Sequence, residues 1–170
     1  AEQVSAAFRI DGLSLSSVTH LVRHRMQSSV IPPLSTVDPN RYIVPDTVAA
    51  DAECLARYRA AFARNAKTLM RLRDMGLARE SCLCLSGNTL SVMTTQNARE
   101  LMLFFRLRTC NRAQWEIREV AQSMLGLLQR EMPDVFCGIG PSCVLMDHCP
   151  EGRMSCGRMD EMRRIYRERG

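Results

Sequence analysis

Two short basic motifs carry the residue types best suited to chemistry in this sequence. Arg23-His24-Arg25 places an imidazole between two guanidinium groups, and Asn97-Ala98-Arg99 places a guanidinium at an expected helix start. Guanidinium groups bind phosphate and carboxylate through paired N–H donors, and the free N–H groups of a helix N-terminus also attract anions. Both motifs therefore indicate an anionic ligand. Taken singly, each is better explained as a basic helix end or a simple helix cap.

Helical and extended patterns surround these motifs. A strand is expected over residues 6–11, and apolar residues at helical spacing predict a helix over residues 14–25. On that helix Arg23 and Arg25 would project about 200° apart. Asn97, with Glu100 three residues later, fits a capping box. Further helices are expected over residues 50–75, 97–108, 112–133 and 159–167, with a second strand over residues 89–95.

The organisation of the chain is that of one α+β domain, mostly helical with few strands. Prolines break up residues 31–45, which predicts an ordered functional loop or a mobile flap. The sequence shows no internal repeat, so a single domain is expected over residues 1–170, with residues 137–170 as its cysteine-rich tail. The chain opens in Ala1-Glu2-Gln3, close to a strand, and we expect upstream sequence to be missing.

Composition excludes several classes of protein. The net charge is +5, and Lys67 is the single lysine among 23 basic residues. A nucleic-acid-binding protein is not favoured, because aromatic residues make up 5% and no binding motif accompanies the charge. The sequence contains no run of about 18 apolar residues, so it predicts no membrane-spanning helix. The sequence shows no export signal, so we expect a cytoplasmic protein in which the 8 cysteines are reduced thiols.

The cysteine-rich tail is the place to look for a metal. It holds Cys137, Cys143, His148, Cys149 and Cys156, but no CxxC pair of the kind zinc sites often use. The irregular spacing favours packed or exposed thiols. No metal is therefore predicted, and the weak candidate ligands are Cys143, Cys149 and Cys156.

The motifs gain meaning from their order. Arg23-His24-Arg25-x-x-Ser28 resembles the start of RHRxxSxNxxSxR, the signature of the flavin-dependent thymidylate synthases. Asn97–Met102 and the LR…AQWEI pattern from Leu107 to Ile117 also match, and Gly76–Glu80 resembles a helix between them. RHR alone is a weak signal, but the three motifs in this order are specific. The resemblance covers most of residues 4–136.

The resemblance implies a fold, cofactors and a site. It implies a mostly helical fold around a small antiparallel sheet, and a homotetramer with active sites shared between subunits. FAD would be reduced by NADPH, methylenetetrahydrofolate would supply one carbon, and a uracil nucleotide would be methylated at C5. Arg108 would help ionise the uracil and is the expected catalytic residue. The FAD-binding residues would be Arg23, His24, Arg25, Asn97, Ala98 and Arg99. The nucleotide-binding residues would be His20, Arg23, Ser28, Ser35, Arg41 and Arg108.

The sequence departs from the signature after Ser28. Val30, Pro33 and Ser35 stand where the family has Asn, Ser and Arg, and Arg41 is the candidate replacement for the lost arginine. The residues expected to bind FAD match the family, whereas the loop expected to bind the nucleotide is altered. This combination favours methylation of UMP for a nucleoside antibiotic, as in polyoxin-like pathways. The alternatives are a divergent thymidylate synthase acting on dUMP, or a degenerate protein that binds flavin or nucleotide without turnover.

Overall fold

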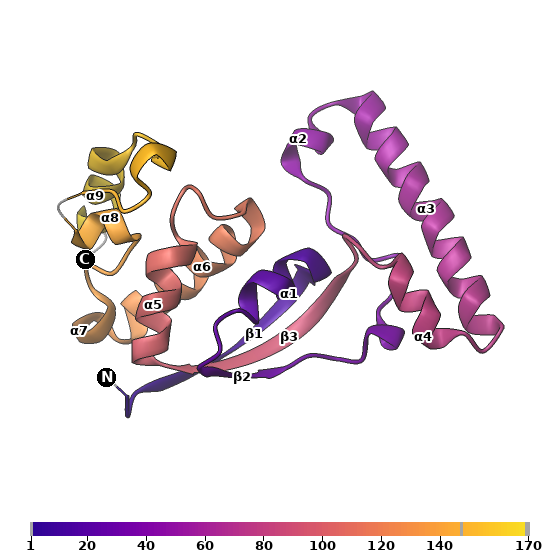
Figure 1. Cartoon of the computed structure of the whole chain (residues 1–170), viewed down its shortest axis with the longest axis horizontal. Helices are drawn as coiled ribbons and strands as arrows, with labels where there is room; N and C mark the ends of the chain where they lie inside the picture. Colours follow the sequence, from indigo (N-terminus) through magenta and orange to yellow (C-terminus); the bar gives the residue numbers. More distant parts are fainter. Residues whose placement is uncertain (1, 147, 169–170) are drawn as a thin grey trace. The chain divides into compact units, whose positions relative to one another are not determined.

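The computed structural model describes residues 2–146 and 148–168, with the side chains of residues 167–168 left out, and shows a mostly helical α+β chain (Figure 1). The strands are β1 (Ser5–Ser14), β2 (Gln27–Val30) and β3 (Thr89–Asn97). The α-helices are α1 (Leu15–Leu21), α2 (Asp46–Ala49), α3 (Ala52–Asp74), α4 (Ala78–Ser81), α5 (Ala98–Arg108), α6 (Trp115–Glu131), α7 (Pro133–Phe136), α8 (Ser142–Leu145) and α9 (Met159–Glu168). Short 3₁₀ turns are η1 (Leu34–Thr36), η2 (Cys82–Cys84) and η3 (Gly152–Met154).

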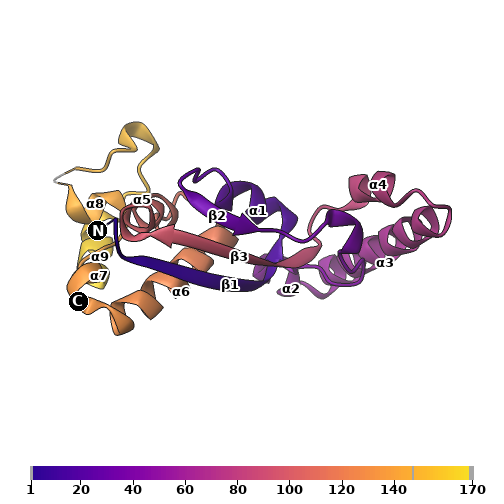
Figure 2. The same cartoon turned by 90° about the horizontal axis from the view of Figure 1, so that it is seen from below.

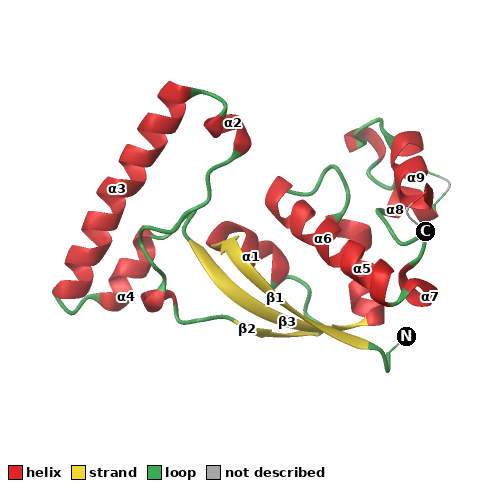
Figure 3. Cartoon of the chain, turned by 180° about the vertical axis from the view of Figure 1, so that it is seen from behind, coloured by secondary structure: helices red, strands yellow, loops and turns green. Residues whose placement is uncertain are grey.

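The three strands form one antiparallel sheet in the order β1-β3-β2 (Figures 2 and 3). Its register is marked by two backbone hydrogen bonds: Ala98 N–H donates to Val4 O at 2.7 Å, and Leu15 N–H donates to Asn88 O at 3.0 Å. The predicted α+β class with a small antiparallel sheet is confirmed. Strand β2 was not predicted, because its four residues are too few to show a period of two.

The chain divides into two compact units. One comprises residues 1–8, 20–28 and 94–170, and the other comprises residues 9–19 and 29–93. Each unit is assembled from separate stretches of the sequence, so the division does not define two domains in succession. The single domain over residues 1–170 stays a prediction.

Aromatic residues build the core of the unit that contains α5 to α9. Helix α5 packs on α6, and Phe104, Phe105 and Phe136 are fully buried there. The ring centroids of Phe105 and Phe136 are 6.1 Å apart in an edge-on arrangement. Near α9, a Cβ at Gly140 would come within 2.7 Å of the buried Tyr166 ring, so only glycine fits there. This core gives α5, which carries two sequence motifs, a rigid support.

The proline-rich loop, residues 31–45, belongs to the other unit, where it is anchored by its backbone. Arg73 on α3 donates to Val37 O at 2.9 Å, and buried Asn88 donates to Pro39 O at 3.0 Å. Tyr42 stacks on Phe62 of α3 with a centroid distance of 4.2 Å. Of the two expected alternatives, these contacts match an ordered loop.

Helix α1 ends earlier than the sequence analysis predicted. It stops at Leu21, so the Arg23-His24-Arg25 motif lies in the loop that follows it. The Leu21 carbonyl accepts the Gln27 side-chain amide at 3.0 Å and His24 N–H at 3.2 Å, and these bonds close the helix end. The predicted helix to residue 25, and the projection angle derived from it, were therefore wrong.

A search of the described helices for a membrane-spanning segment finds none of sufficient length and apolar character.

Candidate functional site

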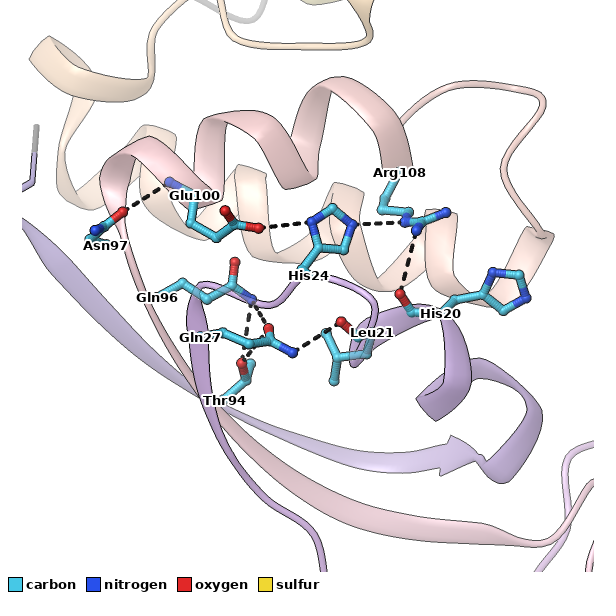
Figure 4. A network of polar contacts seen from close by, with 9 residues as sticks. All are labelled: His20, Leu21, His24, Gln27, Thr94, Gln96, Asn97, Glu100 and Arg108. Carbon is cyan, nitrogen blue, oxygen red and sulfur yellow. Dashed lines mark hydrogen bonds and ion pairs between the residues drawn. The ribbon is translucent and has the colours of Figure 1, made fainter.

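One side chain from the first basic motif and two from α5 meet in a buried polar cluster, drawn in Figure 4. The His24 Nδ1 atom lies 2.9 Å from the Glu100 carboxylate, and both side chains are buried, with exposed fractions of 4% and 8%. On the other side of the ring, Arg108 Nε–H donates to His24 Nε2 at 3.1 Å. Residues 24, 100 and 108 thus form a continuous chain of contacts, which we call the His24 cluster.

Local structure explains how the cluster is positioned. Asn97 caps α5 by accepting Glu100 N–H at 2.9 Å, which confirms half of the expected capping box. The Glu100 carboxylate bonds His24 and so serves the cluster. The loop carrying His24 is fixed by Gln27, whose side-chain oxygen accepts from Thr94 at 3.1 Å and from Gln96 at 2.7 Å (Figure 4). Both ends of the cluster therefore rest on β3 or α5.

Burial and neighbouring charges shift the pKa values in and around the cluster. Burial is the largest cause that lowers the pKa of His24; the Glu100 hydrogen bond opposes it, and the Arg108 charge adds to it. Burial also lowers the pKa of Arg108 and of His20, and the charge of Arg23 contributes to both shifts. Arg23 and Arg108 thus concentrate positive charge beside His20, whose imidazole this charge and burial keep from protonation. Such a site favours an anion.

The flanking arginines of the first motif are open to solvent. Arg23 and Arg25 are exposed, and no described carboxylate lies within ion-pair distance of either. In the second motif, Ala98 is the buried first residue of α5, while exposed Arg99 pairs with Glu2 at 3.1 Å. The structure thus brings His20, Arg23, His24, Arg25, Asn97, Ala98, Arg99 and Arg108 into one unit, as a single site requires.

The remaining predicted nucleotide ligands are divided between the units. Ser28 is an exposed residue of β2 in the same unit as the His24 cluster. Ser35 in η1 is half-buried and Arg41 is exposed, and both belong to the other unit. Arg41 borders a shallow hollow of about 520 Å³ together with Tyr42 and Arg59. The structure gives Arg41 room to contact an anion, but its role stays a prediction.

A cavity of about 430 Å³ lies beside the His24 cluster. Arg106, Arg108 and Arg112 line it, and so do Cys143 and Glu151. The Nε atom of Arg106 is buried without a hydrogen-bond partner among the described atoms. The cavity surface therefore carries guanidinium groups from the last turn of α5 and from the loop that joins α5 to α6.

The cysteines gather more closely than their spacing suggests. Cys110, Cys143, Cys149 and Cys156 line one small cavity of about 10 Å³ next to the larger one. Nevertheless, a search of residues 2–146 and 148–168 finds no group of three or more His, Cys, Asp or Glu side chains that could hold a metal ion. Burial raises the pKa values of the Cys110 and Cys143 thiols. This favours neutral thiols in these positions.

Glu100 and Gln27 are the site residues that the sequence analysis missed. Glu100 was assigned to a helix cap, and the spacing of 76 residues between it and His24 gives no local signal of their contact. Gln27 lies between Arg25 and Ser28 at a position that the family signature leaves unspecified. Only the fold shows that its amide joins the end of α1 to β3.

Comparison with known proteins identifies the family. Residues 1–134 match the family described as "Thymidylate synthase complementing protein". A flavin-dependent thymidylate synthase from Geobacter sulfurreducens is 37% identical, over 98% of this chain and 74% of that protein. One from Clostridium tetani is 36% identical, over 97% of this chain and 74% of that protein. The match covers all motifs that the sequence analysis used.

Solved structures agree with this assignment. A UMP/dUMP methylase, PolB from Streptomyces cacaoi bound with 5-Br dUMP, is 25% identical with a TM-score of 0.68, over 78% of this chain and 68% of that one. The flavin-dependent thymidylate synthase ThyX from Helicobacter pylori, complexed with FAD and dUMP, shares the fold at 20% identity and a TM-score of 0.59, over 80% of this chain and 73% of that one. The sequence-based assignment is confirmed: this chain belongs to the thymidylate synthase complementing protein family, whose enzymes are FAD-dependent nucleotide methyltransferases.

Proposed function

We propose that this chain methylates C5 of a uracil nucleotide, with dUMP as the principal substrate. The observation that carries the proposal is the guanidinium of Arg108, held by His24 where Arg23 adds positive charge. The named activity of the relatives that are 35–37% identical favours dUMP over UMP. Methylenetetrahydrofolate is the proposed carbon donor and NADPH the proposed reductant.

Arg108 acts by stabilising charge on the substrate. A uracil ring becomes nucleophilic at C5 when negative charge develops on the ring, and a fixed guanidinium beside its oxygen atoms lowers the energy of that state. Two of the five N–H donors of Arg108 are directed to His24 and to the His20 carbonyl, at 3.1 and 3.5 Å. The remaining donors are free to face the nucleotide. Arg108 is thus both fixed and available.

The exposed basic residues of the same unit fit FAD. Its diphosphate needs cationic side chains and N–H donors, and Arg23 and Arg25 present guanidinium groups that no described carboxylate neutralises. Asn97 and Arg99 stand at the start of α5, an 11-residue helix whose N-terminus favours negative charge. When bound, FAD supplies the hydride that completes the methyl group. We assign its phosphates to Arg23, Arg25 and Arg99.

A second substrate, UMP, is supported by one observation. Val30, Pro33 and Ser35 replace the polar and basic residues of the family signature, so the nucleotide loop differs from that of an ordinary dUMP enzyme. PolB, described as a UMP/dUMP methylase, shows that the fold accommodates such a substrate. Under this alternative the product would serve nucleoside antibiotic biosynthesis. A cytoplasmic homotetramer with shared sites is proposed for both substrates.

The test is a product assay under anaerobic conditions. The FAD-loaded protein is incubated with NADPH, methylenetetrahydrofolate and either dUMP or UMP, and 5-methylated nucleotide is measured by mass. Product from dUMP in excess of UMP supports the proposal, and a preference for UMP replaces it with the second candidate. Absence of product from both nucleotides would establish the degenerate binding protein instead. The Arg108→Ala variant serves as the negative control.

A further inference from the structure

Glu100 contacts neither the nucleotide nor the flavin in the proposed reaction, yet it is one of the most buried carboxylates among the described residues. Its side chain is 8% exposed, and its described side-chain contact is with His24. Burying a carboxylate is costly unless a partner compensates it. The contact with His24 therefore needs a reason beyond packing.

The hydrogen-bond pattern fixes the protonation state of His24. Arginine is a donor at every nitrogen, so His24 Nε2 must accept the Arg108 Nε–H and carries no proton itself. A neutral imidazole then has its proton on Nδ1, which faces Glu100 Oε1 at 2.9 Å. Glu100 must therefore accept a hydrogen bond from Nδ1–H. If Glu100 were a carboxylic acid that donated to Nδ1, both ring nitrogens would be acceptors and the imidazole would carry no proton.

We propose that Glu100 is a positioning residue for the reaction: it holds His24 as the neutral Nδ1–H tautomer, and this imidazole in turn holds the guanidinium of Arg108. The inference rests on the role proposed above for Arg108. Its geometric basis is the unbroken series of contacts from Glu100 through His24 to Arg108 and on to the His20 carbonyl (Figure 4). Phe104 packs edge-on against the His24 ring at 5.0 Å and prevents it from rotating freely.

The arrangement fails when His24 is protonated. An imidazolium has N–H groups at both nitrogens, so Nε2–H would point at the donor of Arg108 and displace it. The charged groups that face His24 are Glu100 and Arg108, both on α5. Burial and Arg108 lower the pKa of His24, which keeps the ring neutral near pH 7, whereas Glu100 raises it. Removing the Glu100 charge should therefore move the acid limit of activity to lower pH.

The first test observes the tautomer directly. The chain has 3 histidines, so a ¹⁵N-labelled sample of the apoprotein gives a simple imidazole spectrum. We expect His24 to show a protonated Nδ1 and an unprotonated Nε2 at pH 7.5, and His24→Gln assigns the signal. A protonated Nε2, in either the neutral or the charged ring, overturns the proposal. This readout needs no substrate or flavin, so it stands even if the proposed activity fails.

The second test is the pH profile of kcat in Glu100→Gln and Glu100→Leu. Gln keeps an acceptor of the same size, so we expect a small loss of kcat and an acid midpoint at lower pH than in the wild type. Leu removes the acceptor, and we expect kcat to fall about 10- to 100-fold with little change in KM. Glu116→Gln, at another buried carboxylate, is the control and should leave the midpoint unmoved. An unmoved midpoint in Glu100→Gln would reduce Glu100 to a packing residue.

Discussion

The His24 cluster and the proline-rich loop, residues 31–45, are held in opposite ways. In the cluster, side chains bond side chains: His24 contacts Glu100 at 2.9 Å and Arg108 at 3.1 Å. In the loop, side chains from elsewhere bond the backbone: Arg73 reaches Val37 O and Asn88 reaches Pro39 O. The identity of the bonded side chains matters in the first case, whereas these two anchors of the loop depend on the path of its backbone.

This difference explains where the family signature is kept and where it fails. A change at His24 or Arg108 would leave a buried partner unsatisfied, which costs about 1–3 kcal/mol. A carbonyl acceptor exists at every residue, so Val30, Pro33 and Ser35 can replace other residues without loss of the anchors. The loop is therefore free to change its ligand contacts while its anchors persist.

The largest effect is expected from Arg108→Ala. Loss of a guanidinium that stabilises developing charge should lower kcat about 10²- to 10³-fold, with a smaller change in the KM for the nucleotide. Single-turnover kinetics with FAD-loaded enzyme measures it. Arg130→Ala, at an exposed arginine in the last turn of α6, is the control and should behave as the wild type. Retention of more than a tenth of the activity in Arg108→Ala would remove the cluster from the chemistry.

A smaller effect is expected from Arg41→Ala in the loop. If Arg41 replaces the phosphate arginine of the signature, its loss should raise the KM for the nucleotide about 10-fold or more, because one charge-assisted hydrogen bond disappears. The value of kcat should change little, in contrast to Arg108→Ala.

Arg57→Ala is the matched control for the loop variant. Arg57 is also exposed and lies in the same unit, but it is paired with Glu53 at 2.6 Å. Equal KM values in the two variants would show that Arg41 does not bind the phosphate. The loop would then contribute to the site through other residues or not at all.

A third variant, Asn88→Ala, breaks an anchor of the loop without touching a proposed ligand. Asn88 is 1% exposed, and its amide donates to Pro39 O at 3.0 Å and to Arg41 O at 3.3 Å. We expect the free energy of unfolding to fall by about 1–2 kcal/mol, because two backbone carbonyls lose a buried donor. Urea denaturation measures it. A variant as stable as the wild type would contradict the anchoring role.

The sequence was informative where a contact is local or a motif is specific. It predicted α3 and α6 from apolar periodicity, α5 from its N-cap and a strand at β3, and the resemblance gave the family and the residues of the His24 cluster except Glu100. It failed at the end of α1, because the Leu21 carbonyl is capped from Gln27, which lies beyond the helix. It also missed the contact of Glu100 with His24, because these residues are 76 positions apart and meet only when β3 places α5 next to the loop after α1. Tertiary contacts decided both points.

The smallest expected effect is on the rate at which thiols near the His24 cluster react; the proline-rich loop, residues 31–45, contains no cysteine. Cys110 follows Arg108 by two residues and is half-buried, whereas Cys54 and Cys137 are exposed. Burial raises the pKa values of Cys110 and Cys143, so these thiols hold less of the reactive thiolate at pH 8. We expect them to react with iodoacetamide on the order of 10-fold more slowly than the exposed pair.

Peptide mass mapping over time measures these rates, and a sample unfolded in urea is the control in which all 8 cysteines should react alike. The same experiment tests the sequence-based expectation that the tail holds no metal. Free thiols react at rates that a chelator does not change, whereas metal-bound thiols would react faster after chelation because the ligands are released. Acceleration at Cys110, Cys143, Cys149 and Cys156 together would show that the four form a metal site. Unchanged rates would leave burial as the cause of the slow reaction of these thiols, and would give them no metal-binding role beside Arg108.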